Sequence, residues 1–319
     1  MAKRRKIERN FSHDTLPIGK AFDEFLAEKE AKNLSQSTLA NYEQSVRLFM
    51  EFHNLPSTTS TDSISINYFH RWIYSLKEDG VKPTSINHYL RDCRAFFYWC
   101  MERDYLQRFK IELITGQEEA PKLFTDDELM LLLSKPRRDD SFSEWRTWTI
   151  VNWVLGTGCR ASTIVDVKIS DIDFTGKEIS LAHTKNKKAQ IIPLSPTLEL
   201  ALREYLRMWN INNDGWLFPN IGEEKLTTNA LRHSFSRYCN YRGVKKTNIH
   251  GLRHNFAKGW VKNNGNMFAL QKILGHSTLD MTKRYVRLFN EDLKEDFNLY
   301  SPLDTLKKSS KRTQFVKRA

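Results

Sequence analysis

Apolar residues recur at helical spacing in four stretches of the first hundred residues, and polar segments separate these stretches. Residues that are three and four apart lie on one face of an α-helix, so each stretch predicts an amphipathic helix that buries one face in a core. The apolar positions are Ile18, Phe22, Phe25 and Leu26, then Leu39, Tyr42, Val46, Phe49 and Met50, then Phe69, Trp72, Ile73 and Leu76, and finally Ile86, Tyr89, Leu90, Cys93, Phe96, Phe97 and Cys100.

Residues that favour helix termini separate these stretches. Ser35 and Ser37 precede the second stretch, Gly80 follows the third, and Thr84 is expected to cap the fourth. We therefore predict a compact bundle of four helices over residues 16–107. A polar and basic arm over residues 1–15 precedes the bundle, and a polar linker over residues 108–124 follows it.

In the second half of the chain, the spacing of apolar residues is first helical, then alternates as in β-strands, and then becomes helical again. Thr125 and Glu128 form a capping box that opens an apolar helix, and a second apolar helix ends at Gly156. The segment from Ile172 to Leu194 predicts a small antiparallel sheet, whose second turn holds a lysine cluster. Ser195 and Pro196 then predict another helix start. The predicted fold is mainly α with a small antiparallel β-sheet, with a second domain over residues 125–305 and a basic tail over residues 306–319.

The composition points to a polyanionic partner. The 319 residues include 50 Lys and Arg against 38 Asp and Glu, which gives a formal net charge of +12. No apolar run approaches the length of a membrane span, and the basic start lacks the apolar stretch of a signal peptide. The cysteines are few, widely spaced and without a Cys-x-x-Cys pair, which indicates free thiols in a reducing compartment.

Six residues of the second domain together supply what phosphodiester chemistry needs when no metal is used. Arginines neutralise phosphate oxygens, histidine and lysine move protons, and a tyrosine can attack phosphorus and hold it covalently. The six residues are, in chain order, Arg160, Lys185, His250, Arg253, His276 and Tyr285.

The sequence around these residues resembles the tyrosine recombinases, the phage integrase and Xer-type family. Thr157-Gly158-Cys159-Arg160-Ala161-Ser162 is similar to the first arginine box of that family, and His250-Gly251-Leu252-Arg253-His254 to its second. Leu274-Gly275-His276 and Tyr285 fit its third box and its nucleophile. The resemblance covers roughly residues 125–300, and residues 17–107 resemble, more loosely, the helical SAM-like core-binding domain of the family.

The resemblance implies a role for each residue. Arg160 and Arg253 would clamp the non-bridging oxygens, and Tyr285 would attack. His250 is the favoured base, and His276 would donate a hydrogen bond to a phosphoryl oxygen. Lys185 is the favoured proton donor to the leaving 5′ oxygen, because it lies eight residues before Pro193 on a basic hairpin. The rivals for this role in the same turn are Lys187 and Lys188.

Three further residues lie in or near sequences that resemble the family boxes. His254 fits the common second histidine of the family, and we expect it to support the site. Thr163 departs from the family, which commonly has a glutamate there in a supporting position. Arg232 lies in an echo of the second arginine box that lacks the preceding histidine, so we expect a surface or structural role for it.

The implied function is site-specific recombination of double-stranded DNA through a 3′-phosphotyrosine. Four copies would act together on two sites, with help from accessory DNA-bending proteins and without a metal or cofactor. For a prokaryotic or phage source, the expected location is the cytoplasm, in association with the nucleoid. A basic face on the fourth helix is the expected DNA-binding surface of the bundle; it comprises Lys82, His88, Arg91 and Arg94. In the second domain, Lys187 and Lys188 of the hairpin turn are also expected to contact DNA. Two alternatives stay open: a type IB topoisomerase that relaxes DNA, and a catalytically silent DNA-binding regulator.

Overall fold

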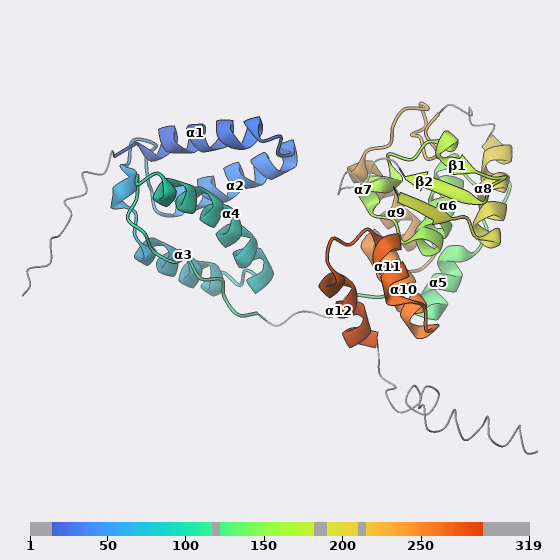
Figure 1. Cartoon of the computed structure of the whole chain (residues 1–319). Helices are drawn as coiled ribbons and strands as arrows, with labels where there is room; N and C mark the ends of the chain where they lie inside the picture. The colour runs from blue at the N-terminus through green and yellow to red at the C-terminus, as the bar shows by residue number, and fades with distance from the viewer. Residues whose placement is uncertain (1–14, 117–121, 182–189, 210–214, 290–319) are drawn as a thin grey trace, which may run out of the picture. The chain divides into compact units, whose positions relative to one another are not determined.

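The computed structural model describes residues 15–116, 122–181, 190–209 and 215–289, and it divides into two compact units (Figure 1). Unit 1 spans residues 1–119 and unit 2 spans residues 120–319. The described part is mostly helical and contains one three-stranded antiparallel sheet, which confirms the predicted fold class. Among the described residues, no helix is long and apolar enough to cross a membrane.

Unit 1 is built from the four predicted helices. They are α1 (Ile18–Ala31), α2 (Gln36–Phe52), α3 (Ile66–Glu78) and α4 (Pro83–Glu102), and a short 3-10 turn spans Thr61–Ser63. Aromatic rings fill the centre: Phe49 lies 4.7 Å from Phe69 and 5.2 Å from Phe97 between ring centroids. Each of these three side chains is almost completely buried, so the helical pattern of the sequence follows directly from this core.

The start of α4 differs from the prediction. Helix α4 begins at Pro83 and its N-cap position is Lys82, so Thr84 is not the cap. Proline suits the first helical position, since its fixed φ is helical and the N–H that it lacks has no partner there. The segment after α4 also belongs to unit 1, because Ile111 is buried and the Asn87 side chain bonds both the N–H and the C=O of Ile114.

Unit 2 contains the remaining helices and the sheet. Helix α6 (Phe142–Thr157) lies at its centre, with Trp145 and Trp153 fully buried, and packs against α5, α8, α9 and α10. The helices around it are α5 (Asp126–Leu133), α7 (Ala161–Ile164), α8 (Pro196–Trp209), α9 (Thr228–Tyr241), α10 (Ile249–Lys262), α11 (Met267–Leu274) and α12 (Leu279–Phe289). The capping box of Thr125 and Glu128 is formed as predicted.

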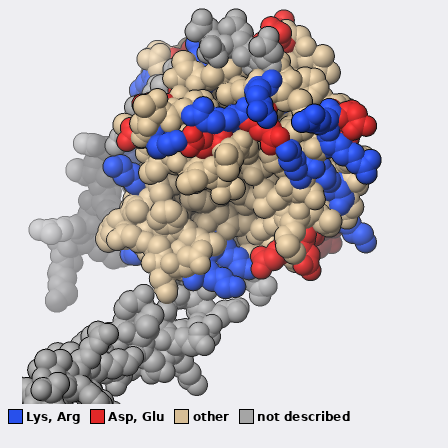
Figure 2. All heavy atoms as spheres, turned by 90° about the vertical axis from the view of Figure 1, so that its right-hand side faces the viewer, with Lys and Arg blue, Asp and Glu red and all other residues tan. Residues whose placement is uncertain are grey.

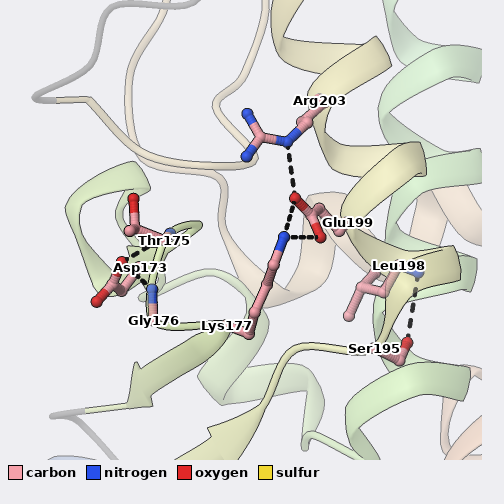
Figure 3. A network of polar contacts seen from close by, with 8 residues as sticks. All are labelled: Asp173, Thr175, Gly176, Lys177, Ser195, Leu198, Glu199 and Arg203. Atoms are coloured by element: carbon pink, nitrogen blue, oxygen red, sulfur yellow. Dashed lines mark hydrogen bonds and ion pairs between the residues drawn. The ribbon is translucent and has the colours of Figure 1, made fainter.

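The sheet lies in the predicted segment and is anchored to α8 by a polar network. Its order is β1 (Ile172–Asp173), β2 (Glu178–Leu181) and β3 (Gln190–Pro193), all antiparallel, and a 3-10 turn over Ile169–Asp171 leads into it. Figure 3 shows Lys177, the residue before β2, donating to Glu199 of α8 at 2.6 Å, while Arg203 Nε donates to the same carboxylate at 2.9 Å. These two cations hold the pKa of Glu199 below its usual value, so the sheet is joined to α8 by a charged contact at neutral pH.

The charge of unit 2 is not gathered into one patch on the face that Figure 2 shows. Basic side chains lie along the rim of that face with acidic side chains between them, and uncharged side chains fill its middle. Ion pairs of unit 2 include Lys177 with Glu199 and Lys246 with Glu128.

Candidate active site

Arg160 is positioned by a tight turn between α6 and α7. Gly158 ends α6 in the left-handed conformation, with φ of +66°, and Arg160 is the N-cap of α7 with extended backbone angles. This turn aims the half-buried guanidinium across unit 2, where Nη2 donates to the carbonyl oxygen of Gly275 at 3.3 Å. The first arginine box therefore meets the third box, 115 residues later in the chain.

Arg253 lies on α10 and is 6% exposed. Its Nη1 donates to the carbonyl oxygen of Gly158 at 2.6 Å, and its Nη2 donates to that of Leu274 at 2.8 Å. Burial, and then the positive charge of Arg160, lower its pKa to about 10. The guanidinium is thus still charged at neutral pH, and its two backbone contacts fix its plane before any phosphate arrives.

His276 follows α11, which ends at Gly275 in the left-handed conformation. Its Nε2 lies 3.1 Å from Nη2 of Arg253, and its Nδ1 lies 2.8 Å from Oγ1 of Thr282. Because an arginine only donates, Nε2 must accept here, and Nδ1 carries the proton that is donated to Thr282. Burial, followed by the charges of Arg253 and Arg160, lowers the pKa of His276 to about 4, so the ring is neutral at pH 7.

Tyr285 lies on α12 and is 7% exposed, packed with Ala257, Leu270 and Leu274. Its hydroxyl lies 2.9 Å from Nδ1 of His254, and its ring is stacked on that of His276 at a centroid distance of 6.0 Å. The phenol therefore lies within one cluster with Arg253, His254 and His276.

Four of the six predicted residues meet in this cluster: Arg160, Arg253, His276 and Tyr285. His250 lies on α10 one turn before His254; its side chain is exposed. The surrounding protein and the charges of Arg253, Arg232 and Arg160 lower its pKa. Arg232, for which a surface or structural role was expected, is exposed on α9 and close enough to act on His250 electrostatically. The predicted hairpin lysines Lys185, Lys187 and Lys188 lie outside the described residues.

The predicted DNA-binding residues of unit 1 belong to α4 and its N-cap. Lys82, His88 and Arg91 are exposed, and Arg94 is half-buried with its guanidinium 5.3 Å from the ring centroid of Tyr98. His88 Nε2 lies 3.6 Å from the carboxylate of Asp92. The three exposed side chains can reach a phosphate, while the aromatic contact of Arg94 restricts its reach; their role in DNA binding stays a prediction.

Two polar residues of the cluster were not among the six. His254 was expected only as a support, and the sequence offered its place in the second arginine box as the sole clue to direct contact with Tyr285. Gln190, at the start of β3, was not singled out at all. Its Nε2 donates to the carbonyl oxygen of Lys272 at 2.6 Å and also to that of Ile273.

The other candidate groups have structural partners. Cys159 is buried, and burial raises the pKa of its thiol, so it is a poor nucleophile. Asp173 accepts from the backbone N–H groups of Thr175 and Gly176 and so closes a turn (Figure 3). Within the described ranges, no three His, Cys, Asp or Glu side chains are grouped so that they could hold a metal ion.

Comparison with known proteins places this geometry in a family. Residues 122–292 match the model of the phage integrase family, and residues 20–104 match that of the phage integrase N-terminal SAM-like domain. Tyrosine recombinase XerC of Listeria monocytogenes is 23% identical over 282 residues, which cover 85% of this chain and 93% of that protein. Tyrosine recombinase XerC of Staphylococcus aureus is 25% identical over 279 residues, with coverage of 84% and 91%.

Two solved structures share the fold. The Tn1549 transposon integrase in complex with a circular intermediate DNA has a TM-score of 0.71 at 21% identity, over 85% of this chain and 95% of that chain. A lambda integrase dimer bound to a COC′ core site has a TM-score of 0.68 at 17% identity, over 86% and 78%.

A helical unit followed by a mixed unit in which two arginines, two histidines and a tyrosine meet is the arrangement of the tyrosine recombinases, enzymes of site-specific DNA recombination. The chain belongs to the phage integrase family of these enzymes, because the family model matches more than half of its length.

Proposed function

We propose that the chain breaks and rejoins double-stranded DNA through a 3′-phosphotyrosine on Tyr285. The observation that supports this most directly is that the phenol lies beside both histidines and the arginine clamp in one cluster. In the proposed step, Oη of Tyr285 bonds to phosphorus, the bond to the 5′ oxygen breaks, and that oxygen leaves with a proton. A 5′ hydroxyl then reverses the step, so no outside energy source is required.

Arg160 and Arg253 would stabilise the pentacoordinate phosphorus. Its negative charge is concentrated on non-bridging oxygens, and two fixed guanidinium groups in a partly buried site oppose that charge without reorganising. Each arginine already donates some of its N–H groups to backbone carbonyl oxygens. The remaining N–H groups are then left pointing in set directions, which supports a role as a phosphate clamp.

His254 is our candidate for the group that takes the phenolic proton, in place of His250. Its Nδ1 lies 2.9 Å from the Tyr285 hydroxyl, within the range for direct transfer. A free phenol has a pKa of about 10, so a base is required near neutral pH. His250 would instead lie at the exposed edge of the site, where it could contact the phosphate.

The pH dependence of adduct formation distinguishes a general base at His254 from one at His250. Replacing the base should slow adduct formation by about 100-fold at pH 7, which is a typical contribution of general base catalysis. The defect should shrink above about pH 9, because the phenol then ionises without help. The measurement is the rate of adduct formation by His254→Ala and His250→Ala between pH 7 and pH 10. Should only the His250→Ala defect shrink, the base is His250.

His276 is proposed to change its bonding when DNA binds. Its Nε2 accepts from Arg253 in the free protein, and burial, together with the charges of Arg253 and Arg160, keeps the ring neutral by lowering its pKa. A phosphodiester would draw the Arg253 N–H to itself, and its negative charge would raise the pKa of His276. A protonated Nε2 could then donate to a phosphoryl oxygen, as the family resemblance implies.

The remaining roles rest on the family resemblance. Lys185 is proposed as the donor to the 5′ oxygen, with Lys187 and Lys188 as alternatives. Because the related lambda integrase forms a dimer on a core site and a tetramer on a Holliday junction, we propose that this chain also binds recombination sites and associates with copies of itself. We also propose that the protein acts in the cytoplasm in association with the nucleoid, and that accessory DNA-bending proteins assist it. A topoisomerase-like relaxation activity and a silent regulator are the alternatives.

The experiment that tests the function traps the covalent intermediate. A nicked suicide DNA that carries the cognate site loses a short fragment after cleavage, so the adduct accumulates. The wild-type chain should form it in EDTA, and Tyr285→Phe should bind the same DNA without forming it, since only the attacking oxygen is lost. An adduct that survives Tyr285→Phe would show that another residue attacks. A wild-type chain that binds but never forms an adduct would favour the silent regulator.

A further inference from the structure

The last turn of α11 presents a row of carbonyl oxygens to side chains from three other elements. Lys272 and Ile273 accept from Gln190 on β3, Leu274 accepts from Arg253 on α10, and Gly275 accepts from Arg160 before α7. Four successive carbonyls are therefore bound by one neutral amide and by the two arginines of the clamp.

The geometry of the turn explains why these carbonyls are available. The backbone of Gly275 has the left-handed conformation. The N–H of Gly275 donates to the carbonyl oxygen of Lys272, and the N–H of His276 donates to that of Gln271. Lys272 therefore accepts from both Gly275 and Gln190, whereas the carbonyls of Ile273, Leu274 and Gly275 have no N–H of the helix to bind. These carbonyls carry the negative end of the helix dipole. Cationic or N–H donors are favoured there, and in this protein the donors are the clamp and Gln190.

Gln190 is held in place both through its backbone and through its side chain. Its backbone pairs with Leu181 in the β2–β3 ladder, and Leu181 is buried, so the strand is held by the core of unit 2. A Cβ built on Gly275 would lie 3.4 Å from Oε1 of Gln190 and 3.6 Å from Nη1 of Arg160. The amide and the guanidinium thus flank the same glycine in close packing, which leaves the turn little room to shift.

We infer that Gln190 is a positioning residue of the phosphate clamp, an inference that rests on the proposed function. Its amide holds the α11 turn against the sheet, and the carbonyls of Leu274 and Gly275 in turn set the planes of Arg253 and Arg160. A neutral donor suits this place, because a third cation would compete with the arginines for the same carbonyls, and a carboxylate would face carbonyl oxygens without a proton to share.

The test compares two substrates that differ in charge at the scissile position. A methylphosphonate lacks one of the two charged non-bridging oxygens, so misplacing one guanidinium matters less for it. The variants are Gln190→Ala and Gln190→Glu, with Ile191→Ala as the control, because Ile191 is the next residue on β3 and is 59% exposed. The measurements are single-turnover adduct formation on each substrate and the melting temperature of each variant.

Gln190→Ala should slow adduct formation on the phosphodiester by about tenfold, the scale of one ordinary hydrogen bond. The methylphosphonate should be slowed much less, Gln190→Glu should be slower still on the phosphodiester, and Ile191→Ala should match the wild type. Similar melting temperatures for all the variants would exclude a general loss of folding.

Equal slowing on both substrates, or no slowing, would overturn the inference. A defect of Gln190→Ala that disappears on a 5′-bridging phosphorothiolate would also overturn it, because that substrate needs no proton on its leaving group and the residue would then act through Lys185. These failures are distinct from failure of the proposed function, since wild-type adduct formation and its loss in Tyr285→Phe do not depend on Gln190.

Discussion

Gly158→Ala is expected to damage stability and the active site together. Gly158 has φ of +66°, and its carbonyl oxygen accepts a 2.6 Å hydrogen bond from Arg253. A Cβ at this position would lie 2.6 Å from Cδ1 of Phe256 and 2.8 Å from Cδ2 of Leu274. Both distances are shorter than carbon atoms tolerate, and both neighbours are packed beside the clamp, so the turn must shift.

The magnitude follows from two separate costs. A left-handed residue with a Cβ costs about 1–2 kcal/mol, and forcing a carbon into a packed core costs about 1–3 kcal/mol more, for a total of about 2–5 kcal/mol. Gly243 provides the matched control, because its φ is +74° and a Cβ there would meet nothing within 4 Å. Gly243→Ala should therefore show the first cost alone, about 1–2 kcal/mol.

Urea unfolding of the two variants and the wild type measures the difference. At about 2–4 °C per kcal/mol for a domain of this size, the melting temperatures should separate as well. Adduct formation should be slowed only in Gly158→Ala, since only that substitution moves a carbonyl that binds Arg253. Equal destabilisation of the two variants would refute the packing argument, and a fully active Gly158→Ala would refute the link to Arg253.

Two further predictions concern protons. Because the folded-state pKa of His276, about 4, lies below the ordinary value of about 6.5, the unfolded chain binds the extra proton first, so stability should fall as pH drops from about 6.5 to about 4. Urea unfolding across this window should show a shallower fall for His276→Gln, and an unchanged slope would contradict the assignment. Lys185→Ala should slow cleavage of ordinary DNA severely and should be rescued by a 5′-bridging phosphorothiolate, whose leaving group needs no proton. Equal slowing on both substrates, in single-turnover assays, would move the role to Lys187, Lys188 or His250.

The sequence predicted the elements well where local chemistry decides them. The four helices of unit 1 follow from apolar spacing, and the capping box at Thr125 follows from two side chains three residues apart. The predicted cap of α4, Thr84, was wrong by two residues, because Pro83 fits the first helical position and Lys82 is the N-cap without a side-chain hydrogen bond. Of the six residues that the family boxes singled out, Arg160, Arg253, His276 and Tyr285 lie together in unit 2, and their catalytic roles stay a prediction.

The sequence by itself determined which chemical groups this protein has and in which order they occur, because helix periodicity, capping and motif spacing are local properties. Only the tertiary structure decided which groups touch. His250 and His254 are one turn apart on α10, and the packing of α12 selects His254 as the neighbour of Tyr285. Gln190 reaches carbonyls 82 and 83 residues later in the chain, a contact that depends on how the sheet packs on α11. No local pattern encodes such a distance, since packing of the whole unit sets it.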